Sequence, residues 1–477
     1  MTPQRRTMTM PAFNYLIVSD LHLRGGFTNR TERLYHFDDE FAEFLRYYRV
    51  HRRSERPWHL VIGGDFIEFL FINDLPDRTD RLLRGVHFSA SENRYGASTE
   101  APKARWKLDR ILRSSHAQLL IALARFVFEG NHVSVLRGNH DSEMFWPEVK
   151  EHFRRLIAEH HPQDVSYLQM KDAVRERVQF PDWFFFTPGL LYVEHGCQYD
   201  PFCSFEYFMN PVVPERPTHI EMSIAELGIR YFANQMKVIN AMAAENIMSV
   251  SEYIGWVMRG NLSVMARTLG LYTAMVRHVL AKAGRPHPAA EATVRAEHQR
   301  RVAETDALFG LPPGTAATVD GMHATPVMRY RLAIARFLAL DLIGGGALLF
   351  LAALAIVIWF PANIGLLALV GAVAAVGLIG YVGALRFRRV TEGAQLHRTA
   401  ERLAALFRVP YVVFGHSHGA GTWPLAGGAT YVNVGTWVPE GESAYFVYFG
   451  MEETDGTQVA RLWRWNKAQR EPEPFEA

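Results

Sequence analysis

A run of 44 residues without charge, Leu342–Leu385, most constrains how this chain can fold. The run contains no Asp, Glu, Lys, Arg or His, and only Pro361-Ala362-Asn363 interrupts it. Its two halves, of 19 and 23 residues, each match the roughly 20 apolar residues that cross a bilayer as a helix. A buried hairpin in a soluble core is the alternative, but few cores enclose two helices that are apolar all round. We therefore expect a two-helix transmembrane hairpin at residues 338–386.

Basic residues flank both halves of this run: Arg329, Arg331 and Arg336 before it, and Arg386, Arg388 and Arg389 after it. Positively charged flanks stay on the cytoplasmic side of a membrane. The stretch up to Phe13 has no apolar core long enough for a secretory signal. The sequence thus predicts a multi-pass protein of the cell (inner) membrane, with the lipid bilayer as a partner and the remainder of the chain on the cytoplasmic face.

Outside the run, the sequence alternates short apolar stretches with amphipathic helical ones, which predicts an α/β fold. Tyr15–Val18, a helix over Asp38–Arg49 and His59–Ile62 show this alternation. The polar stretch Asp77–Lys103 is expected to form a long surface loop. After Pro217 the helical spacing of apolar residues predicts two to four helices over Ile220–Lys282.

The expected order of domains follows from these changes in composition. Arg285–Thr325 contains Pro and Gly and is expected to be a linker with one helical stretch. The predicted domains are a core in two parts (13–216 and 387–470), an inserted helical cap and linker (217–337) and the hairpin (338–386).

Overall composition excludes several classes of protein. Hydrophobic residues at 49% and charged residues at 21% are typical of a folded protein. A net charge of +2 gives no global reason to expect nucleic acid as a partner. Two cysteines cannot build a disulfide framework or a four-thiolate zinc site, and we expect Cys197 and Cys203 to be small buried residues.

Five apolar runs each lead to side chains that can bind a metal. Tyr15–Val18 leads to Asp20 and His22, His59–Ile62 to Asp65, His132–Leu136 to Asn139, His140 and Asp141, Leu190–Glu194 to His195, and Tyr411–Phe414 to His416 and His418. Ligands at the carboxyl ends of adjacent strands converge on one crevice. Imidazole and carboxylate together hold first-row divalent metals, and the neighbouring glycines allow tight turns and close approach of a phosphate. Any one of these residues alone is more simply a surface or core residue, but the ordered set predicts a metal centre.

These motifs resemble those of the calcineurin-like metallophosphoesterases. The resemblance rests on Asp20-x-His22, Gly64-Asp65, Gly138-Asn139-His140-Asp141, His195 and Gly415-His416-x-His418, and covers roughly Phe13–His195 and Pro410–Phe449. It implies a four-layer α/β/β/α sandwich with two mixed sheets. By motif position it also implies that Asp20, His22 and His418 hold one metal, that Asn139, His195 and His416 hold the other, and that Asp65 bridges both. His140 would be the catalytic histidine and Asp141 a partner that orients it.

The chemistry implied by the resemblance is hydrolysis of a phosphoester or pyrophosphate. Two cations that share a bridging water make hydroxide near neutral pH, and that hydroxide attacks phosphorus. A protonated His140 would stabilise the developing charge or protonate the leaving oxygen. Mn²⁺ is the expected metal, and Fe, Zn and Mg remain as alternatives because ligand type and geometry admit several ions.

Ser19–Leu23 and Gly64–Asp74 are similar to the UDP-2,3-diacylglucosamine diphosphatases, which split a pyrophosphate at the membrane surface. Position 140 is His here, where those enzymes typically carry Arg, and the insertion between His195 and His416 is far longer. Because the predicted hairpin would hold the enzyme at the bilayer surface, we expect a lipid-linked or nucleotide-sugar-lipid substrate. The alternatives are a soluble phosphorylated substrate and a non-catalytic membrane scaffold.

Four other polar residues lie near the expected ligands. Glu68 and Asp74 follow the bridging aspartate, and could either orient the ligands or lie outside the site. Arg24 and Arg137 could clamp a phosphate or form surface ion pairs.

Overall fold

The structure is a computed structural model, and it describes residues 13–25, 37–72, 75–77, 79, 81–82, 85–235, 262–283, 287–338, 340, scattered positions over 351–380, 392–438, 446–454 and 457–476. The chain forms two compact units. Unit 1 comprises Met1–Glu221, His287–Ala324 and Gly393–Ala477, and unit 2 comprises Met222–Pro286 and Thr325–Glu392.

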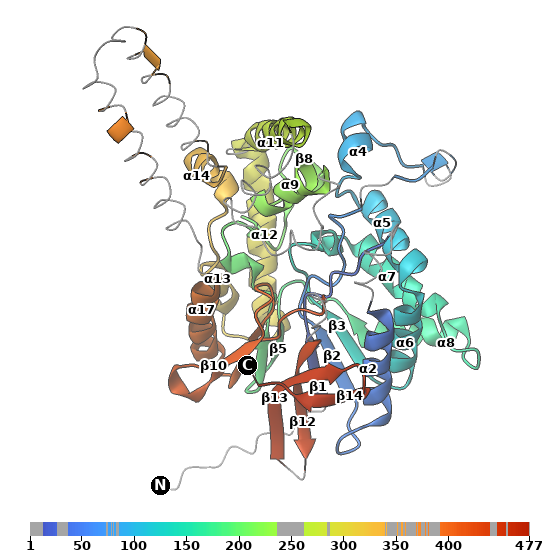
Figure 1. Cartoon of the computed structure of the whole chain (residues 1–477). Coiled ribbons are helices and arrows are strands. Elements are labelled where there is room, and N and C mark those ends of the chain that lie inside the picture. Colours follow the sequence, from blue (N-terminus) through green and yellow to red (C-terminus); the bar gives the residue numbers. More distant parts are fainter. Residues whose placement is uncertain are drawn as a thin grey trace. The chain divides into compact units, whose positions relative to one another are not determined.

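Two mixed β-sheets form the centre of unit 1 (Figure 1). The seven-stranded sheet has the order β14 (Glu471–Pro474), β13 (Thr457–Asn466), β12 (Val447–Thr454), β1 (Asn14–Val18), β2 (Trp58–Ile62), β3 (His132–Val135) and β4 (Val178–Gln179). The five-stranded sheet has the order β10 (Gly421–Pro424), β11 (Thr430–Asn433), β9 (Tyr411–Phe414), β6 (Leu191–Val193) and β5 (Phe185–Thr187). The neighbours β1, β2, β3 and β4 are parallel, as are β6, β9 and β11. A small hairpin of β7 (Val212–Val213) and β8 (Arg216–Ile220) lies apart from both sheets.

Alternation along the central strands divides their side chains between two cores. In β1, Leu16 and Val18 belong to one cluster, whereas Tyr15 and Ile17 belong to another that also contains Val413 of β9. Successive side chains of a strand point to opposite faces of its sheet. The cluster shared by strands of both sheets therefore lies between them, and the two sheets pack face to face.

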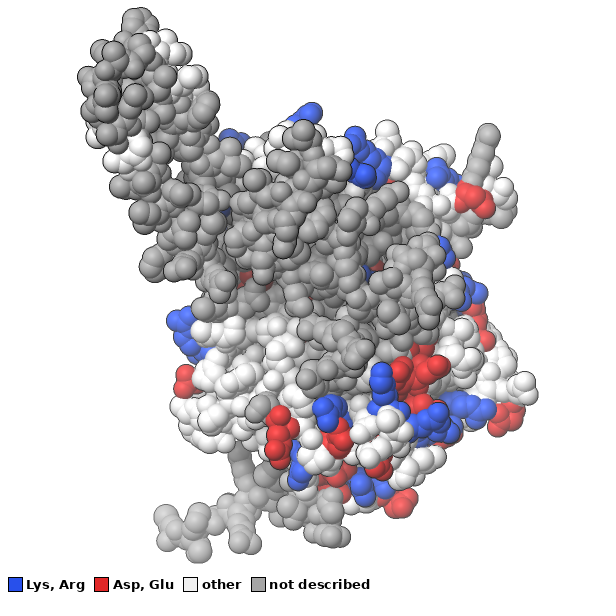
Figure 2. All heavy atoms as spheres, viewed as in Figure 1, with Lys and Arg blue, Asp and Glu red and all other residues white. Residues whose placement is uncertain are grey.

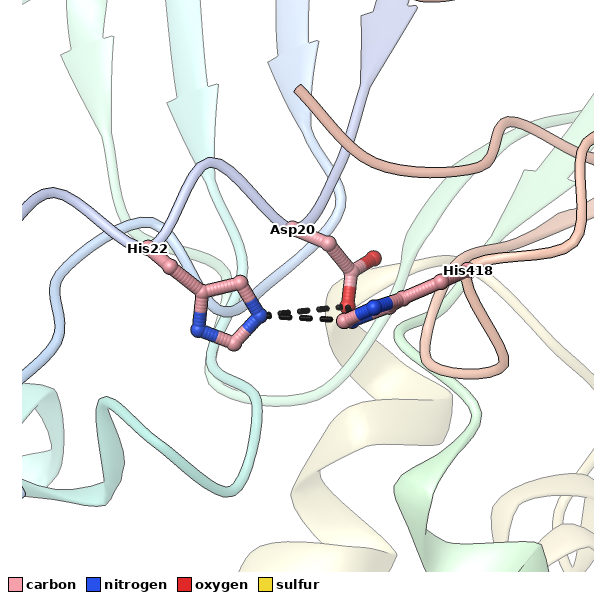
Figure 3. A group of neighbouring side chains, drawn as sticks. All are labelled: Asp20, His22 and His418. Atoms are coloured by element: carbon pink, nitrogen blue, oxygen red, sulfur yellow. Dashed lines mark hydrogen bonds and ion pairs between the residues drawn. The ribbon is translucent and has the colours of Figure 1, made fainter. Parts of the chain in front are cut away.

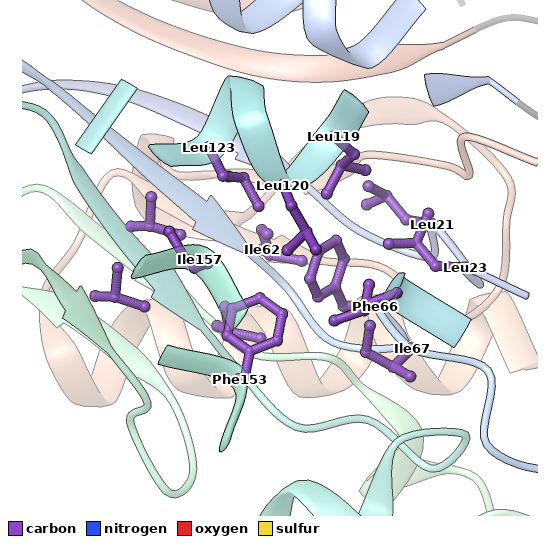
Figure 4. Packing of buried hydrophobic residues seen from close by; sticks show 14 of the residues in the cluster. Leu21, Leu23, Ile62, Phe66, Ile67, Leu119, Leu120, Leu123, Phe153 and Ile157 are labelled. Carbon is purple, nitrogen blue, oxygen red and sulfur yellow. The ribbon is translucent and has the colours of Figure 1, made fainter. Parts of the chain in front are cut away.

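Helices cover the outer face of each sheet. The apolar faces of α2 (Asp38–Val50), α5 (Ala101–Ser115), α6 (Ala117–Phe128), α7 (Pro147–Glu159) and α8 (Tyr167–Arg177) pack on the seven-stranded sheet. Those of α12 (Pro288–Leu308), α13 (Thr315–Asp320) and α17 (Glu392–Phe407) pack on the five-stranded one. Figure 4 shows Leu119, Leu120 and Leu123 of α6 packed near Ile62 and Phe66. The predicted mixed α/β class is confirmed.

The segment expected to be a linker is part of the outer helical layer. Val294 and Val302 of α12 are buried in the same cluster as Val412 and Phe414 of β9. The compact units accordingly differ from the expected boundaries, because His287–Ala324 groups with unit 1 and not with the inserted region. Unit 2 contains α9 (Ile224–Tyr231), α11 (Leu262–Lys282) and α14 (Arg331–Phe337).

Part of the expected surface loop at Asp77–Lys103 is helical. Ser89 accepts a hydrogen bond from the backbone N–H of Glu92, and the Glu92 side chain accepts one from the backbone N–H of Ser89. This capping box satisfies two N–H groups at the start of a helix, and α4 (Ala90–Tyr95) follows. The prediction of a long surface loop was wrong for this part of the segment, because the Ser-x-x-Glu pattern caps a helix within it.

The predicted transmembrane hairpin lies largely outside the described residues. Among the residues that the structure does describe, no single helix has the length and apolar composition to cross a bilayer. Within the same described residues, α5 and α6 together are long and apolar enough, but they are bent by 95° at their junction. Because both helices contribute to the core on the seven-stranded sheet, that pair is accounted for by packing in unit 1. The hairpin stays a prediction.

Leu120 offers a test of this core. It is fully buried between α6 and the seven-stranded sheet, so Leu120→Ala should lower the free energy of unfolding by about 2–5 kcal/mol through lost burial and a residual cavity. Urea unfolding followed by circular dichroism measures this. Leu168→Ala is the matched control, because Leu168 is 69% exposed, and equal midpoints for the two variants would contradict the placement of α6.

Candidate metal centre

The loops that carry the predicted ligands leave both sheets at their carboxyl ends. After β1 and β2 the two backbones remain paired: Asp20 N–H donates to Gly64 O, and His22 N–H donates to Asp65 O (3.1 and 2.9 Å). In the other sheet, Glu194 N–H donates to Val413 O and Gly415 N–H donates to His195 O (both 3.1 Å). Backbone hydrogen bonds alone therefore hold each pair of neighbouring loops together.

Five predicted ligands have a left-handed backbone conformation. The φ angles of Asp20, His22, Asp65, His416 and His418 lie between 44° and 65°. Non-glycine residues seldom adopt this region, and Asp and His are among those that tolerate it best. Such strained backbones occur preferentially at functional sites. Here they turn the chain sharply directly after each strand.

Asp20, His22 and His418 form the first group of ligands (Figure 3). The Asp20 Oδ1 atom lies 3.2 Å from His418 Nε2 and 3.8 Å from His22 Nε2, and the two Nε2 atoms are 3.4 Å apart. Atoms that bind one divalent ion at about 2.0–2.2 Å are themselves roughly 3–3.6 Å apart. The spacing of this group therefore fits a shared ion closely.

Asp65 connects the first group to a second. Its Oδ2 atom lies 3.9 Å from His22 Nε2 and 3.2 Å from His195 Nε2. Asn139 is held beside Asp65, because the following residue, His140, donates its backbone N–H to Asp65 Oδ1 (2.8 Å). The ring of His416 lies 5.3 Å from that of His195, measured between centroids. The structure thus brings all seven predicted ligands to the same edge of the two sheets.

Three buried atoms of these residues make no hydrogen bond of ordinary geometry in the described part of the chain: Asp20 Oδ1, Asn139 Oδ1 and His195 Nε2. Within that part, Asp20 Oδ1 and His195 Nε2 have only their ion pairs within the cluster, and Asn139 Oδ1 has none of these. Each is an atom that the motif assigns to a metal. A buried polar atom left unsatisfied costs about 1–3 kcal/mol, and a bound cation would remove that cost. The residues therefore fit a pair of divalent ions.

The pKa values of this cluster show that it favours positive charge. Burial alone would lower the pKa of His22, but the neighbouring carboxylates of Asp20 and Glu68 raise it to about 10. Burial acts likewise on His195, whose pKa is raised to about 9 by the charge of Asp65. Burial would raise the pKa of Asp65, yet the charges of His195 and His140 lower it below its usual range. Divalent ions would replace these protons, because metal ligands must be deprotonated.

Glu68, and not Asp141, orients His140. The fully buried Glu68 carboxylate pairs through Oε2 with His140 Nδ1 (2.7 Å) and with His22 Nδ1 (3.0 Å). Asp141 accepts the backbone N–H groups of Gly138 and Phe66 instead (2.6 and 2.8 Å), so it fixes the loop. Of the two roles left open for Glu68, the structure therefore supports the one in which it orients ligands. Asp74 lies outside the described residues.

Asp200 and Cys203 are site residues that the sequence analysis missed. Asp200 Oδ2 lies 3.3 Å from His416 Nε2, and both residues group with the Cys203 thiol within metal-ligand spacing. With Nε2 paired to Asp200, the nitrogen of His416 left for a metal is Nδ1. The available signal was proximity, since Asp200 is five residues beyond His195. Cys197 and Cys203 are buried, as predicted.

The glycines serve the approach of side chains within the site. A Cβ atom on Gly138 would lie 2.0 Å from Asp65 Oδ1, and one on Gly415 would lie 2.2 Å from Asp20 Oδ2. The Asp65 carboxylate therefore approaches Gly138, and the Ser19 hydroxyl and the Asp20 carboxylate approach Gly415. Arg137 is buried, donates to Phe208 O (2.6 Å) and lies over the Phe208 ring, so it forms no surface ion pair. Arg24 lies over the ring of Phe71.

No protein-family model matches this chain, and no curated protein is significantly similar to it. The function must therefore be inferred from the motifs and from the geometry of the cluster.

Glu68→Gln tests the group around His22. The substitution keeps the shape of the side chain but removes the charge that pairs with two imidazoles, so we expect Mn²⁺ affinity at one site to fall about 10- to 100-fold. Titration calorimetry on protein stripped with a chelator measures it. Glu129→Gln, on the exposed surface, should bind both ions as the parent does, and unchanged binding by the Glu68 variant would refute the role.

Asp200→Asn tests the other group. Loss of the charge that fixes the His416 ring should weaken one Mn²⁺ site about 10- to 100-fold and leave the other unchanged. The same titration resolves the two classes of site. Asp306→Asn is a control of similar burial, since Asp306 only accepts the N–H groups of Gly314 and Ala316. Equal weakening of both sites would argue against a role confined to His416.

Proposed function

We propose that this chain is a two-metal hydrolase of phosphate esters or anhydrides, with the sandwich of the calcineurin-like metallophosphoesterases in unit 1. Helices outside two mixed sheets, with ligands at their carboxyl ends, support that fold. The observation that carries the proposal is the trio of buried atoms that make no hydrogen bond of ordinary geometry among the described residues, Asp20 Oδ1, Asn139 Oδ1 and His195 Nε2. Without a metal, Asn139 Oδ1 would have no partner among the described residues, and Asp20 Oδ1 and His195 Nε2 would have only ion pairs within the cluster, the shortest with His418 and Asp65 (3.2 Å each).

Seven of the residues would bind the metal ions, and His140 would take part in proton transfer. Asp20, His22 and His418 would hold one ion, and Asn139, His195 and His416 the other, with Asp65 between them. When bound, such a pair of ions supplies a nucleophile at neutral pH and offsets the charge of the phosphoryl oxygens.

His140 is the group placed to act on the leaving oxygen. Its Nδ1 atom is held by Glu68, and its side chain is 11% exposed whereas that of Glu68 is fully buried. The Nε2 atom is thus the one left to donate a proton to the departing oxygen or a hydrogen bond to the phosphoryl group. Burial would raise the pKa of Glu68, but His140 lowers it to about 2, so the carboxylate that holds the His140 ring is ionised.

The proposed location is the cytoplasmic face of the inner membrane, with a lipid-linked substrate. The chain leaves unit 1 after Ala324 and returns to it at Gly393, so an even number of crossings is required if Leu342–Leu385 lies in a bilayer. The mixed charge of unit 1 also supports a small substrate over nucleic acid. In Figure 2, basic and acidic side chains lie side by side over the region of α2, unlike the continuous basic surface that tracks a phosphate backbone.

The decisive experiment combines metal content with turnover. Protein purified in detergent and loaded with Mn²⁺ should hydrolyse an aryl phosphodiester or a nucleotide-lipid pyrophosphate, and Asp65→Asn should lose both metal retention and turnover. His140→Asn should keep about two metal ions per chain and lose about 10²–10⁴-fold in turnover.

His51→Asn is the control, because the exposed His51 ring contacts Tyr47, through its backbone carbonyl and its ring, and no residue of the metal cluster among the described contacts. Elemental analysis and a chromogenic assay give both readouts. Equal turnover by the parent and by Asp65→Asn would sink the proposal, as would a parent protein that binds no metal. Turnover with a water-soluble diester but none with the lipid pyrophosphate would favour a soluble substrate.

A further inference from the structure

Unit 2 is strongly basic, although the chain as a whole is almost neutral. It contains 13 Lys and Arg against 5 Asp and Glu, a net charge of +8. The rest of the chain contains 38 against 44, a net charge of −6. The small net charge of the whole therefore hides two units of opposite sign, and unit 2 favours an anionic partner.

The helix α11 combines this charge with exposed apolar side chains. Its 21 residues, Leu262–Lys282, include no Asp or Glu. Met275 and Val279 are buried, whereas Leu269 and Leu280 are 66% and 44% exposed, and Arg267 and Arg277 are exposed beside them. A helix on the surface of a soluble unit normally presents charged and polar residues outward. An outward face of leucine and arginine without acids is typical of helices that lie in a membrane interface.

A second helix of unit 2 has the same composition. Leu332 of α14 and the preceding Tyr330 are 63% and 52% exposed, and Arg331 between them is exposed. The hydroxyl of Tyr272 in α11 donates to the carbonyl of Leu338, directly after α14. The two helices are therefore linked within unit 2, and their exposed side chains share one chemistry.

We propose that α11 and α14 form a surface that binds anionic phospholipid. The leucines would enter the boundary between headgroups and acyl chains, and the arginines would meet the phosphates. A bilayer is favoured over a protein partner because the uncharged run Leu342–Leu385 begins five residues after α14. The described apolar residues within that run (Leu351, Leu354, Ile358, Leu369 and Val373) are helical and exposed. This inference rests on the proposed membrane location and is independent of the proposed hydrolysis.

The test uses the full chain in lipid nanodiscs of phosphatidylcholine, with or without phosphatidylglycerol. A spin label on Leu269→Cys reports collisions with oxygen, which enters the bilayer, and with a water-soluble nickel chelate. We expect the nickel accessibility of this label to fall several-fold when phosphatidylglycerol is present, while oxygen accessibility rises. Leu168→Cys in α8 is the matched control, because Leu168 is equally exposed at 69% and belongs to unit 1. The parent protein, whose two cysteines are buried, gives the background.

Charge reversal separates electrostatic binding from simple burial. Arg267→Glu with Arg277→Glu, in the Leu269→Cys background, should remove the dependence on phosphatidylglycerol. Nickel accessibility at 269 equal to that at 168 in both kinds of nanodisc would overturn the proposal. Protection that appears in detergent alone and increases with protein concentration would overturn it in favour of a second copy of the chain. Hydrolytic activity is read separately, so its absence would not bear on this result.

Discussion

The buried carboxylate of Asp20 is the contact on which the meeting of the two sheets depends. It follows β1 of one sheet, yet its Oδ2 atom accepts the backbone N–H of His416, 396 residues further along the chain (3.0 Å). Its own carbonyl accepts the Thr436 hydroxyl and the Trp437 N–H. One residue thus ties the loops after β9 and β11 to the loop after β1. Loss of the carboxylate would leave the His416 N–H without this acceptor, at a cost of about 1–3 kcal/mol.

How much of this site follows from sequence depends on how local each contact is. The strands β1 and β9 were predicted within a residue, because alternation is a local property. The ligands after them were predicted to converge because parallel strands end at one edge of a sheet. The pairings of Glu68 with His140 and of Asp200 with His416 could not be predicted, since they join side chains across loops whose paths depend on backbone turns. The packing of α12 was missed because its pattern gives no strong apolar face.

Those turns also explain how strain is retained at the site. A left-handed residue other than glycine costs of order 1–3 kcal/mol and persists only where its surroundings fix it. At His22 and Asp65 the fixing contacts are visible, because the two backbones are hydrogen-bonded to each other beyond the ends of β1 and β2. The side chains are fixed too, since Glu68 holds the ring of His22. Such a preorganised group loses little entropy when it binds an ion, which favours tight binding.

The second group of ligands is held differently, and the difference follows from the insertion. The loop from His195 to Asp200 contacts unit 1 residues near two of the four points where the chain passes between units: Ala324 N–H donates to Gln198 O (2.8 Å), and Leu396 packs close to Gly196. A shift at either point would move His195 directly and His416 through Asp200. Asp20 and His22 follow β1, and Asp65 follows β2. Among the described contacts, none of these three residues touches Ala324 or Leu396. The geometry therefore makes one half of the centre depend on the sheet core and the other half depend on the chain segments that lead to unit 2.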